Sequence, residues 1–219
     1  MIYSSKYTSI ADAWFGLLYN IQEHGYKQPI QRGSFAGDEN YRIQYPFVAI
    51  EIEHPSIDMI PTMPQGMESL APTTMEYVED YFVNYLMNDK ISENEDYVYG
   101  SRIVGYVDEV IRMLKETPYT NQAVLEIASP GDIYLSDPTC LRCLTFKIIS
   151  GRIDMSIFFR SNDLYGGFCS NLGGLELLKQ LIASEANLEN GKIYYASDGL
   201  HIYSNQLKIV NTRLNRSSV

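Results

Sequence analysis

The sequence predicts an α+β protein, in which a mostly antiparallel or mixed sheet carries helices on one face. Two observations support this fold class. Apolar residues recur at helical spacing in several separated segments, whereas others alternate between apolar and polar residues with the period of a strand. Helical segments dominate the first half of the chain and strand-like segments the second. We expect the sheet face without helices to be a dimer interface.

The N-terminal half contains three expected helices. In the first, apolar residues repeat from Ile10 to Ile21, with Ser9 placed as N-cap and Gly25 as the stop. A half-buried strand over residues 41–53 and a Pro- and Met-rich surface loop over residues 55–72 follow. The other two helices are amphipathic and lie within "TTMEYVEDYFVNYLM" and "YVDEVIRMLKETP", the second of which ends at a proline.

The C-terminal half contains most of the expected strands. "QAVLEIAS", "CLRCLTFKII" and "RIDMSIFFR" are strand-like, and Ser150-Gly151 joins the last two as a hairpin. The helix "LGGLELLKQLIASEA" follows, and short strands are expected near residues 192–196 and 199–204.

Composition indicates one globular domain over residues 1–219, since 45% of the 219 residues are hydrophobic and 20% are charged. The net charge of −10 argues against a nucleic-acid backbone or an anionic membrane as partner. The N-terminus has no basic region before an apolar core, and no apolar run approaches a membrane span. The three cysteines form no disulfide framework, so we expect a cytoplasmic protein.

Reactive side chains gather in three stretches: around Cys140, within "FFRSNDLYGGFCSN" and within "DGLHIY". A cysteine beside an arginine favours the thiolate, which is a nucleophile. Arg160 and Ser161 offer a charged fork and a hydroxyl suited to phosphate. Gly166-Gly167 leaves room for a flat ligand, and Asn171 can read the amide edge of a base.

His201 and Tyr203 alternate along one strand, so their side chains reach the same face. Together with Cys140, Arg160 and Asn171 they indicate a nucleotide site with a cysteine nucleophile. Each residue also has a plain structural interpretation: a core cysteine, a surface ion pair, a helix cap or cross-strand packing. The "CLRC" motif lacks a second CxxC for zinc and precedes no expected helix, as a redox motif would.

The stretches "DPTCLRCLTFKI", "FRSNDLYGGFCSNLGGLELL" and "DGLHIYSNQ", in this order, resemble the thymidylate synthase and deoxynucleotide hydroxymethylase superfamily. The resemblance is strongest to the short form found in archaea, some bacteria and phages. It covers residues 95–206 well and the N-terminal part loosely. It implies a thymidylate synthase-like fold and a homodimer.

The resemblance implies roles for individual residues. Cys140 would add to C6 of the pyrimidine of dUMP, and C5 would then attack a methylene-tetrahydropterin, either methylenetetrahydrofolate or a relative. Arg160 would bind the phosphate and hold Cys140 as a thiolate, and Ser161 would also contact phosphate. "VYGSRI" makes Tyr99 a candidate for proton transfer at C5, and "QRGSFAG" makes Arg32 a phosphate ligand.

Further roles concern the base, the sugar and the pterin. Asp163 would contact the pterin, and Gly167 marks where the backbone closes on the ligand. Asn171 would pair with N3–H and O4 of uracil. His201 and Tyr203 would bind the 3′-hydroxyl of deoxyribose, and either Glu76 or Glu79 would be the catalytic glutamate.

The product implied is dTMP. The alternatives are a hydroxymethylase acting on dUMP or dCMP, and a non-catalytic nucleotide-binding homologue. The chain departs from the family pattern at several positions: Leu141 follows the cysteine where histidine is usual, Asn121 and Gln122 stand where the partner's phosphate arginines are expected, and Trp14 is the only tryptophan. Arg142, expected on the same strand face as Cys140, is a candidate substitute for those arginines. The loop 55–72 is expected to be either a lid or a packed segment.

Overall fold

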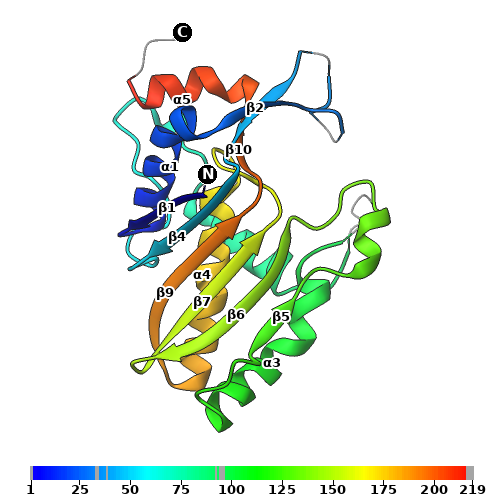
Figure 1. The fold of residues 1–219 in the computed structure, drawn as a ribbon. Helices are drawn as coiled ribbons and strands as arrows, with labels where there is room; N and C mark the ends of the chain where they lie inside the picture. The colour runs from blue at the N-terminus through cyan, green and yellow to red at the C-terminus, as the bar shows by residue number, and fades with distance from the viewer. Residues whose placement is uncertain (1, 33–34, 38, 92, 94–96, 216–219) are drawn as a thin grey trace.

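The computed structural model describes residues 2–32, 35–37, 39–91, 93 and 97–215. They form two sheets, one of six strands and one of four, with helices against one face of the larger sheet (Figure 1). The α+β class and the mixed sheet predicted from the sequence are confirmed.

The six-stranded sheet has the order β1-β4-β9-β7-β6-β5. The β1–β4 and β7–β9 pairs are parallel, and the others are antiparallel. Its strands are β1 (Ile2–Tyr7), β4 (Phe47–Ile52), β5 (Val124–Glu126), β6 (Leu141–Ile149), β7 (Arg152–Phe159) and β9 (Glu189–Ser197).

The four-stranded sheet has the order β2-β3-β10-β8 and stands beyond one end of the larger sheet (Figure 1). Its strands are β2 (Tyr26–Pro29), β3 (Tyr41–Gln44), β8 (Asn162–Asp163) and β10 (Leu200–Tyr203). The prediction of one strand over residues 41–53 is wrong, because the chain breaks at Tyr45-Pro46 and enters both sheets. Pro46 has no N–H for a ladder, and Tyr45 N–H donates to Leu200 O at 3.0 Å.

Helices α1 (Ile10–His24), α3 (Gly100–Glu116) and α4 (Phe168–Ala186) cover one face of the larger sheet (Figure 1). The predicted caps of α1 are confirmed, since Asp12 N–H donates to the Ser9 hydroxyl at 3.1 Å and Gly25 follows the last turn. The remaining helical segments are short: α2 (Met75–Asp80), the π-helical η2 (Tyr81–Leu86), α5 (Leu207–Arg213), and the 3₁₀ turns η1 (Glu68–Leu70), η3 (Pro130–Tyr134) and η4 (Ser204–Gln206).

The hairpin between β6 and β7 is confirmed. Ser150 and Gly151 have φ of 53° and 79°, the two positive values that a two-residue hairpin turn with the twist of its strands requires.

Strand β6 contains a β-bulge at Arg142. Leu141 pairs with Phe159 and Cys143 with Phe158, which leaves Arg142 as the extra residue. The N–H groups of Ile127 and Ala128 both donate to Arg142 O at 3.0 Å. The bulge shifts the alternation of side chains between the two faces of the sheet. Leu141 is therefore fully buried, while Cys143 lies on the sheet face without helices.

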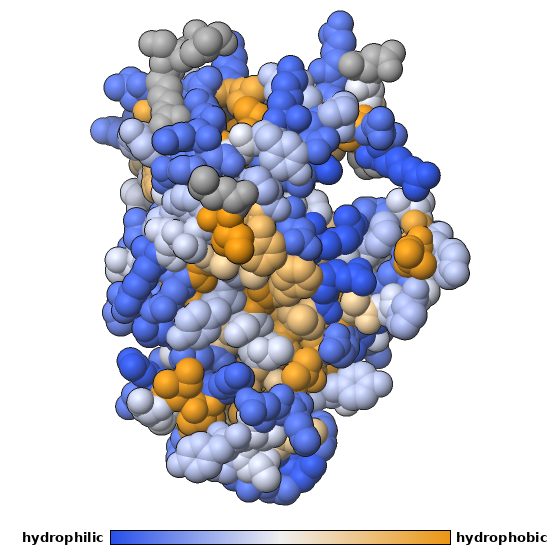
Figure 2. Space-filling model, in the orientation of Figure 1, coloured by the Kyte–Doolittle hydropathy of each residue, from blue (hydrophilic) through white to orange (hydrophobic). Residues whose placement is uncertain are grey.

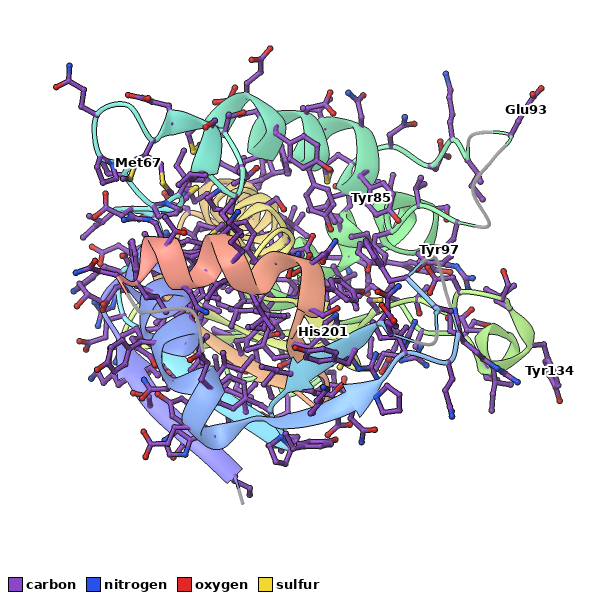
Figure 3. All side chains as sticks on the ribbon, turned by 90° about the horizontal axis from the view of Figure 1, so that it is seen from above. Met67, Tyr85, Glu93, Tyr97, Tyr134 and His201 are labelled. Carbon is purple, nitrogen blue, oxygen red and sulfur yellow. The ribbon has the colours of Figure 1, made fainter. Side chains whose placement is uncertain are left out.

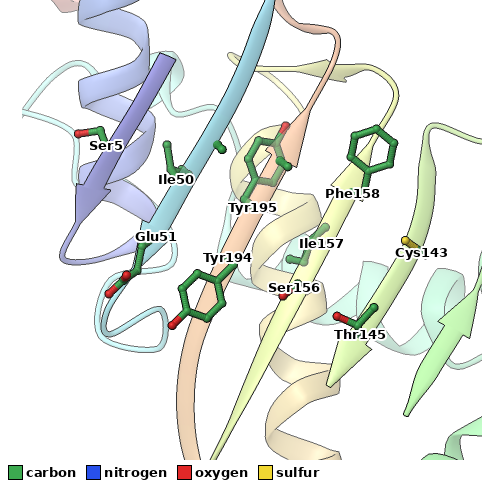
Figure 4. A pocket seen from close by; sticks show the side chains of 12 residues that line it. Ser5, Ile50, Glu51, Cys143, Thr145, Ser156, Ile157, Phe158, Tyr194 and Tyr195 are labelled. Carbon is green, nitrogen blue, oxygen red and sulfur yellow. The ribbon is translucent and has the colours of Figure 1, made fainter. Parts of the chain in front are cut away.

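That face is partly apolar, and Figure 2 shows the apolar residues gathered over its middle. A hollow of about 450 Å³ lies there (Figure 4), between side chains of β1, β4, β9, β7 and β6. Phe158, Tyr194 and Thr145 are among its lining residues and are only partly buried.

The loop 55–72 packs against the body of the protein. Met59, Ile60 and Met63 lie against the hydrophobic core. Asp58 O accepts from Ala11 N–H at 3.0 Å, and Thr62 O accepts from the Arg213 guanidinium at 2.9 Å. These contacts favour the packed segment over the lid among the two interpretations of this loop.

Among the residues described, no helix is long and apolar enough to span a bilayer.

Candidate active site

A cleft of about 580 Å³ brings together several residues that the sequence analysis singled out. It lies where the ends of β6 and β7 meet the four-stranded sheet. Its lining residues are Ile30, Arg32, Phe35, Arg42, Ser136, Asp137, Cys140, Arg160, Ser161 and Tyr203. The nucleophile candidate and the three phosphate ligands implied by the resemblance therefore share one cleft.

Cys140 stands immediately before β6, where backbone contacts fix it. Its carbonyl accepts from Arg160 N–H at 2.9 Å. The next residue, Leu141, donates its N–H to the Tyr99 hydroxyl oxygen at 3.1 Å. Because this oxygen accepts a hydrogen bond, the Tyr99 hydroxyl proton stays available beside Cys140.

Arg160 and Arg142 both hold the segment before the cysteine. Arg160 Nε donates to Thr139 O at 3.1 Å, and its guanidinium also bonds Pro138 O and the Asp137 carboxylate. Arg142 Nη1 donates to the same carbonyl at 3.1 Å. The predicted substitute for the partner's phosphate arginines is thus engaged within its own loop.

Asp132 is almost fully buried and anchors the segment before Cys140. Its carboxylate accepts from the Thr139 hydroxyl at 2.8 Å and from the Arg102 guanidinium at 3.0 Å. The sequence analysis did not identify Asp132, because only the fold brings it to Thr139.

Opposing influences act on the Cys140 thiol. Burial raises its pKa, the nearby Arg160 and Arg142 charges lower it, and Asp137 raises it. The net direction is upward, and the thiolate held by Arg160 that the resemblance implies stays a prediction.

We predict that Asp137→Asn accelerates alkylation of Cys140 at neutral pH. Loss of the carboxylate removes a charge that raises the thiol pKa and frees Arg160 to stabilise the thiolate. Iodoacetamide labelling followed by peptide mass analysis measures the rate, with Asp198→Asn, another exposed site, as the control. An unchanged or lower rate in Asp137→Asn would contradict the electrostatic account.

Asn171 lies in the first turn of α4, which begins at Phe168, earlier than the helix predicted from Leu172. Its Nδ2 donates to Asn162 Oδ1 at 3.2 Å, and Asn162 Nδ2 donates to the Tyr195 hydroxyl at 3.3 Å. This chain fixes the Asn171 amide and leaves its carbonyl oxygen for a ligand. Asn162, which sequence reasoning missed, is the residue that orients it.

Asp163 and Gly167 shape the turn before α4. Asp163 Oδ1 accepts the N–H groups of Tyr165 and Gly166, and its Oδ2 accepts from Gln206 Nε2 at 2.9 Å. Gly167 N–H donates to Asp163 O at 3.0 Å. These contacts give both residues a structural role, and their contact with a pterin stays a prediction.

His201 is buried, with 2% of its surface exposed. Its Nδ1 lies 2.7 Å from Gly199 O, and its Nε2 is inaccessible and has no hydrogen-bond partner among the described residues. Burial lowers the pKa of His201, which favours the neutral ring. With Nδ1–H donating to Gly199, Nε2 is an acceptor that suits a ligand hydroxyl.

Tyr203 packs beside His201, with ring centroids 4.7 Å apart. Phe35 stacks on the Tyr203 ring, with centroids 4.3 Å apart. Phe35 and Arg42 are cleft residues that the sequence analysis did not identify. The only sequence feature that could have pointed to Arg42 as a site residue was its charge within the strand predicted over residues 41–53.

A cluster of tyrosines lies next to the segment that holds Cys140. Tyr81 stacks on Tyr85 at 5.3 Å, Tyr85 meets the edge of Tyr99 at 5.1 Å, and Tyr97 stacks on Tyr99 at 5.8 Å. Figure 3 labels Tyr85 and Tyr97, the two rings that contact Tyr99. Burial raises the pKa of Tyr99 well above its usual value, so its phenol is neutral.

The two glutamates considered for catalysis, Glu76 and Glu79, are exposed on α2 and do not line the cleft. The structure therefore favours neither of them as a group in contact with the substrate.

In the described part of the chain, no group of three or more metal-ligating side chains lies together. Cys140 and Cys143 are separated by the bulge, and Cys143 faces the hollow on the opposite sheet face.

The cleft of this mixed α+β fold combines a partly buried cysteine with several arginines, which is a set of side chains suited to an anionic ligand. Residues 82–219 match the family model described as thymidylate synthase, and the chain belongs to the thymidylate synthase family.

Similar proteins cover most of the chain. A Methanosarcina barkeri protein named "Putative thymidylate synthase" is 29% identical over 92% of this chain and 90% of its own length. The "Thymidylate synthase" of Staphylococcus haemolyticus is 30% identical over 55% of this chain and 42% of its own. The solved structure of thermostable thymidylate synthase A from Bacillus subtilis shares the fold, with a TM-score of 0.71 and 13% identity, over 97% of this chain and 86% of that one.

Proposed function

We propose that this protein is a one-carbon transferase that alkylates C5 of dUMP to give dTMP, through a covalent bond between Cys140 and C6. The observation that carries the proposal is the position of Cys140 in one cleft with Arg32, Arg160 and Ser161. Family membership supports the same chemistry.

The residues around the base supply the covalent step. The Cys140 thiol loses its proton, its sulfur bonds to C6, and the ring π electrons move toward C5 and the oxygen on C4. The fixed Asn171 amide is suited to hold the N3–H and O4 edge. Tyr99, whose hydroxyl lies beside Leu141 N, is placed to exchange a proton at C5.

Recognition of the nucleotide uses the other end of the cleft. Arg32, Arg160 and Ser161 bind the phosphate, for which Arg160 must exchange its contact with Asp137. His201 Nε2 and Tyr203 bind the 3′-hydroxyl. The unpartnered buried Nε2 supports this assignment, because such an atom gains a hydrogen bond from a ligand.

A methylene-tetrahydropterin, methylenetetrahydrofolate or a relative, supplies the carbon and the hydride when bound. The aromatic surfaces of Tyr85 and Tyr97 suit its flat ring. Asp163 and Gly167 would hold it at the turn before α4.

Hydroxymethylation of dUMP or dCMP is the second candidate, favoured by one observation. The loop 55–72 packs on the core and among the described residues does not line the cleft. If water reaches the reacting carbon before hydride does, the product is a hydroxymethyl nucleotide.

The experiment that separates the candidates is incubation with dUMP and methylenetetrahydrofolate, with products resolved by mass. We expect dTMP and one dihydropterin per turnover. Hydroxymethyl-dUMP formed without oxidation of the pterin would replace this proposal with the second candidate. Binding of dUMP, and of dCMP in a parallel incubation, without turnover of either nucleotide would indicate the non-catalytic homologue.

We also propose that the open face of the larger sheet is covered by a second copy of the chain. Its partly exposed apolar side chains and the hollow in Figure 4 support this arrangement. Light scattering should then report twice the chain mass of 25.0 kDa. A monomer at micromolar concentration would contradict it.

A further inference from the structure

Arg42 lines the phosphate end of the cleft from a strand of the smaller sheet. It lies on β3, where it pairs with Tyr203 of β10 on one side and Gln28 of β2 on the other. The same cleft holds Arg32 and Arg160. Three arginines from separate parts of the chain therefore line the same cleft.

The charge of Arg42 lacks a partner in the described part of the chain. Its Nε is inaccessible and makes no hydrogen bond there. Burial lowers the pKa of the neighbouring His201, and the charge of Arg42 lowers it further, which places that charge close to the ring. A partly buried, unpaired guanidinium is costly, so an anion in the cleft stabilises it.

We infer that Arg42 binds the 5′-phosphate together with Arg32 and Arg160, so that one subunit completes the phosphate site. The inference rests on the proposed function. It accounts for Asn121 and Gln122 at the positions where the resemblance expects arginines from a partner subunit. Arg142, the other substitute, is bonded to Thr139 instead.

The test compares dUMP with deoxyuridine, which lacks the phosphate. Arg42→Gln should raise the Kd for dUMP about 10- to 100-fold and leave the Kd for deoxyuridine unchanged, since a charge-assisted phosphate contact contributes on that order. Arg42→Lys should restore part of the affinity. Arg152→Gln, at the exposed start of β7, is the control.

An unchanged dUMP affinity in Arg42→Gln would overturn the inference while leaving the proposed function standing. Equal affinity of the wild-type protein for dUMP and deoxyuridine would contradict both. Thermal unfolding shows whether Arg42→Gln is misfolded. If it is, inorganic phosphate is used to compete with dUMP for binding to Arg42→Lys. Weaker competition than in the wild-type protein supports the inference, and equal competition contradicts it.

An independent observation concerns Tyr81, the first residue of the π-helical η2. Its ring lies against Gly174 of α4, where an added Cβ would stand 2.4 Å from Tyr81 Cδ1. Gly174 follows Asn171 by three residues, so both lie on the same side of the helix. The glycine allows the phenol ring to approach the element that carries the base-reading amide.

The Tyr81 hydroxyl oxygen is inaccessible and has no hydrogen-bond partner among the described residues. Through Tyr85 its ring joins Tyr99, whose hydroxyl lies beside the nucleophile's strand. Burial raises the pKa of Tyr81, and the proximity of Tyr99 and Cys140 raises it further. The Tyr81 hydroxyl is therefore a neutral donor in the tyrosine cluster close to Cys140.

We propose that Tyr81 is a catalytic residue that donates a hydrogen bond to the oxygen on C4 of the pyrimidine as Cys140 adds to C6. This role also rests on the proposed function. It explains how the site operates with Glu76 and Glu79 exposed to solvent. No proton leaves Tyr81 in this step, since the phenol only stabilises the developing charge.

The test follows release of tritium from C5 of labelled dUMP, which requires addition at C6. Tyr81→Phe should slow release about 100- to 1,000-fold without weakening dUMP binding, the size of effect expected for one donor to a developing oxyanion. Tyr77→Phe, exposed on α2, is the control. Equal release rates in Tyr81→Phe and wild type would overturn the role, whereas absence of a Cys140 adduct with 5-fluoro-dUMP in wild type would contradict the proposed function itself.

Discussion

Cys140→Ser should reduce product formation by about 10⁴-fold or more, because a serine hydroxyl at neutral pH is a much weaker nucleophile than a thiol and its anion. The protein should remain folded, since Cys140 precedes β6 and only its backbone is bonded there. Steady-state dTMP formation measures the loss, and circular dichroism checks the fold.

The identity of the nucleophile is measured by mass analysis of peptides after incubation with 5-fluoro-dUMP and cofactor. We expect the adduct on Cys140. Cys143→Ser is the matched control and should keep activity, because its side chain faces the opposite side of the sheet. Cys169 is fully buried and burial raises its pKa strongly, so it should not react. An adduct on Cys143 or Cys169 would contradict the assignment.

Asn171→Asp should lower activity on dUMP sharply and raise the relative use of dCMP. An amide offers a donor and an acceptor to uracil, whereas a carboxylate accepts from the amino group of cytosine and leaves uracil O4 unpaired. Sites that leave buried hydrogen-bonding groups unpaired discriminate by several orders of magnitude, so we expect a change in the kcat/KM ratio of about 100-fold or more.

The structure makes this substitution a fair test of specificity. Asn162 can rotate its amide so that its N–H donates to the new carboxylate and its oxygen accepts from the Tyr195 hydroxyl. The chain that orients position 171 is thereby kept. A wild-type preference for dCMP, or an unchanged preference in the variant, would contradict the role of Asn171.

Local elements of the fold were predictable from the sequence. The caps of α1 and the Ser150-Gly151 turn depend on neighbouring residues, and both are confirmed. The break at Tyr45-Pro46 was not predicted, because it depends on pairing with β10, more than 150 residues along the chain. Strand β1 and helix α5 were missed for a similar reason: each is short and is stabilised by distant partners.

The site shows the same limit. Motif spacing placed Cys140, Arg160 and Ser161 together, and the cleft confirms that they are neighbours. The position of Arg42 in the same cleft depends on how the two sheets pack against each other, and no local sequence pattern predicts that packing. The charge state of Cys140 was also beyond reach, since it depends on burial and on the carboxylate of Asp137.

The bulge at Arg142 separates the two ends of β6, because the register with β7 shifts between Leu141 and Cys143. The end near the nucleophile is held by Thr139, Asp132 and Arg160, while the remainder follows the register of the hairpin. We expect substitutions that tilt or twist the outer part of the hairpin to bend the strand at the extra residue, with a smaller displacement at Cys140. The outer end of the strand should therefore tolerate more sequence change than the end that holds Cys140.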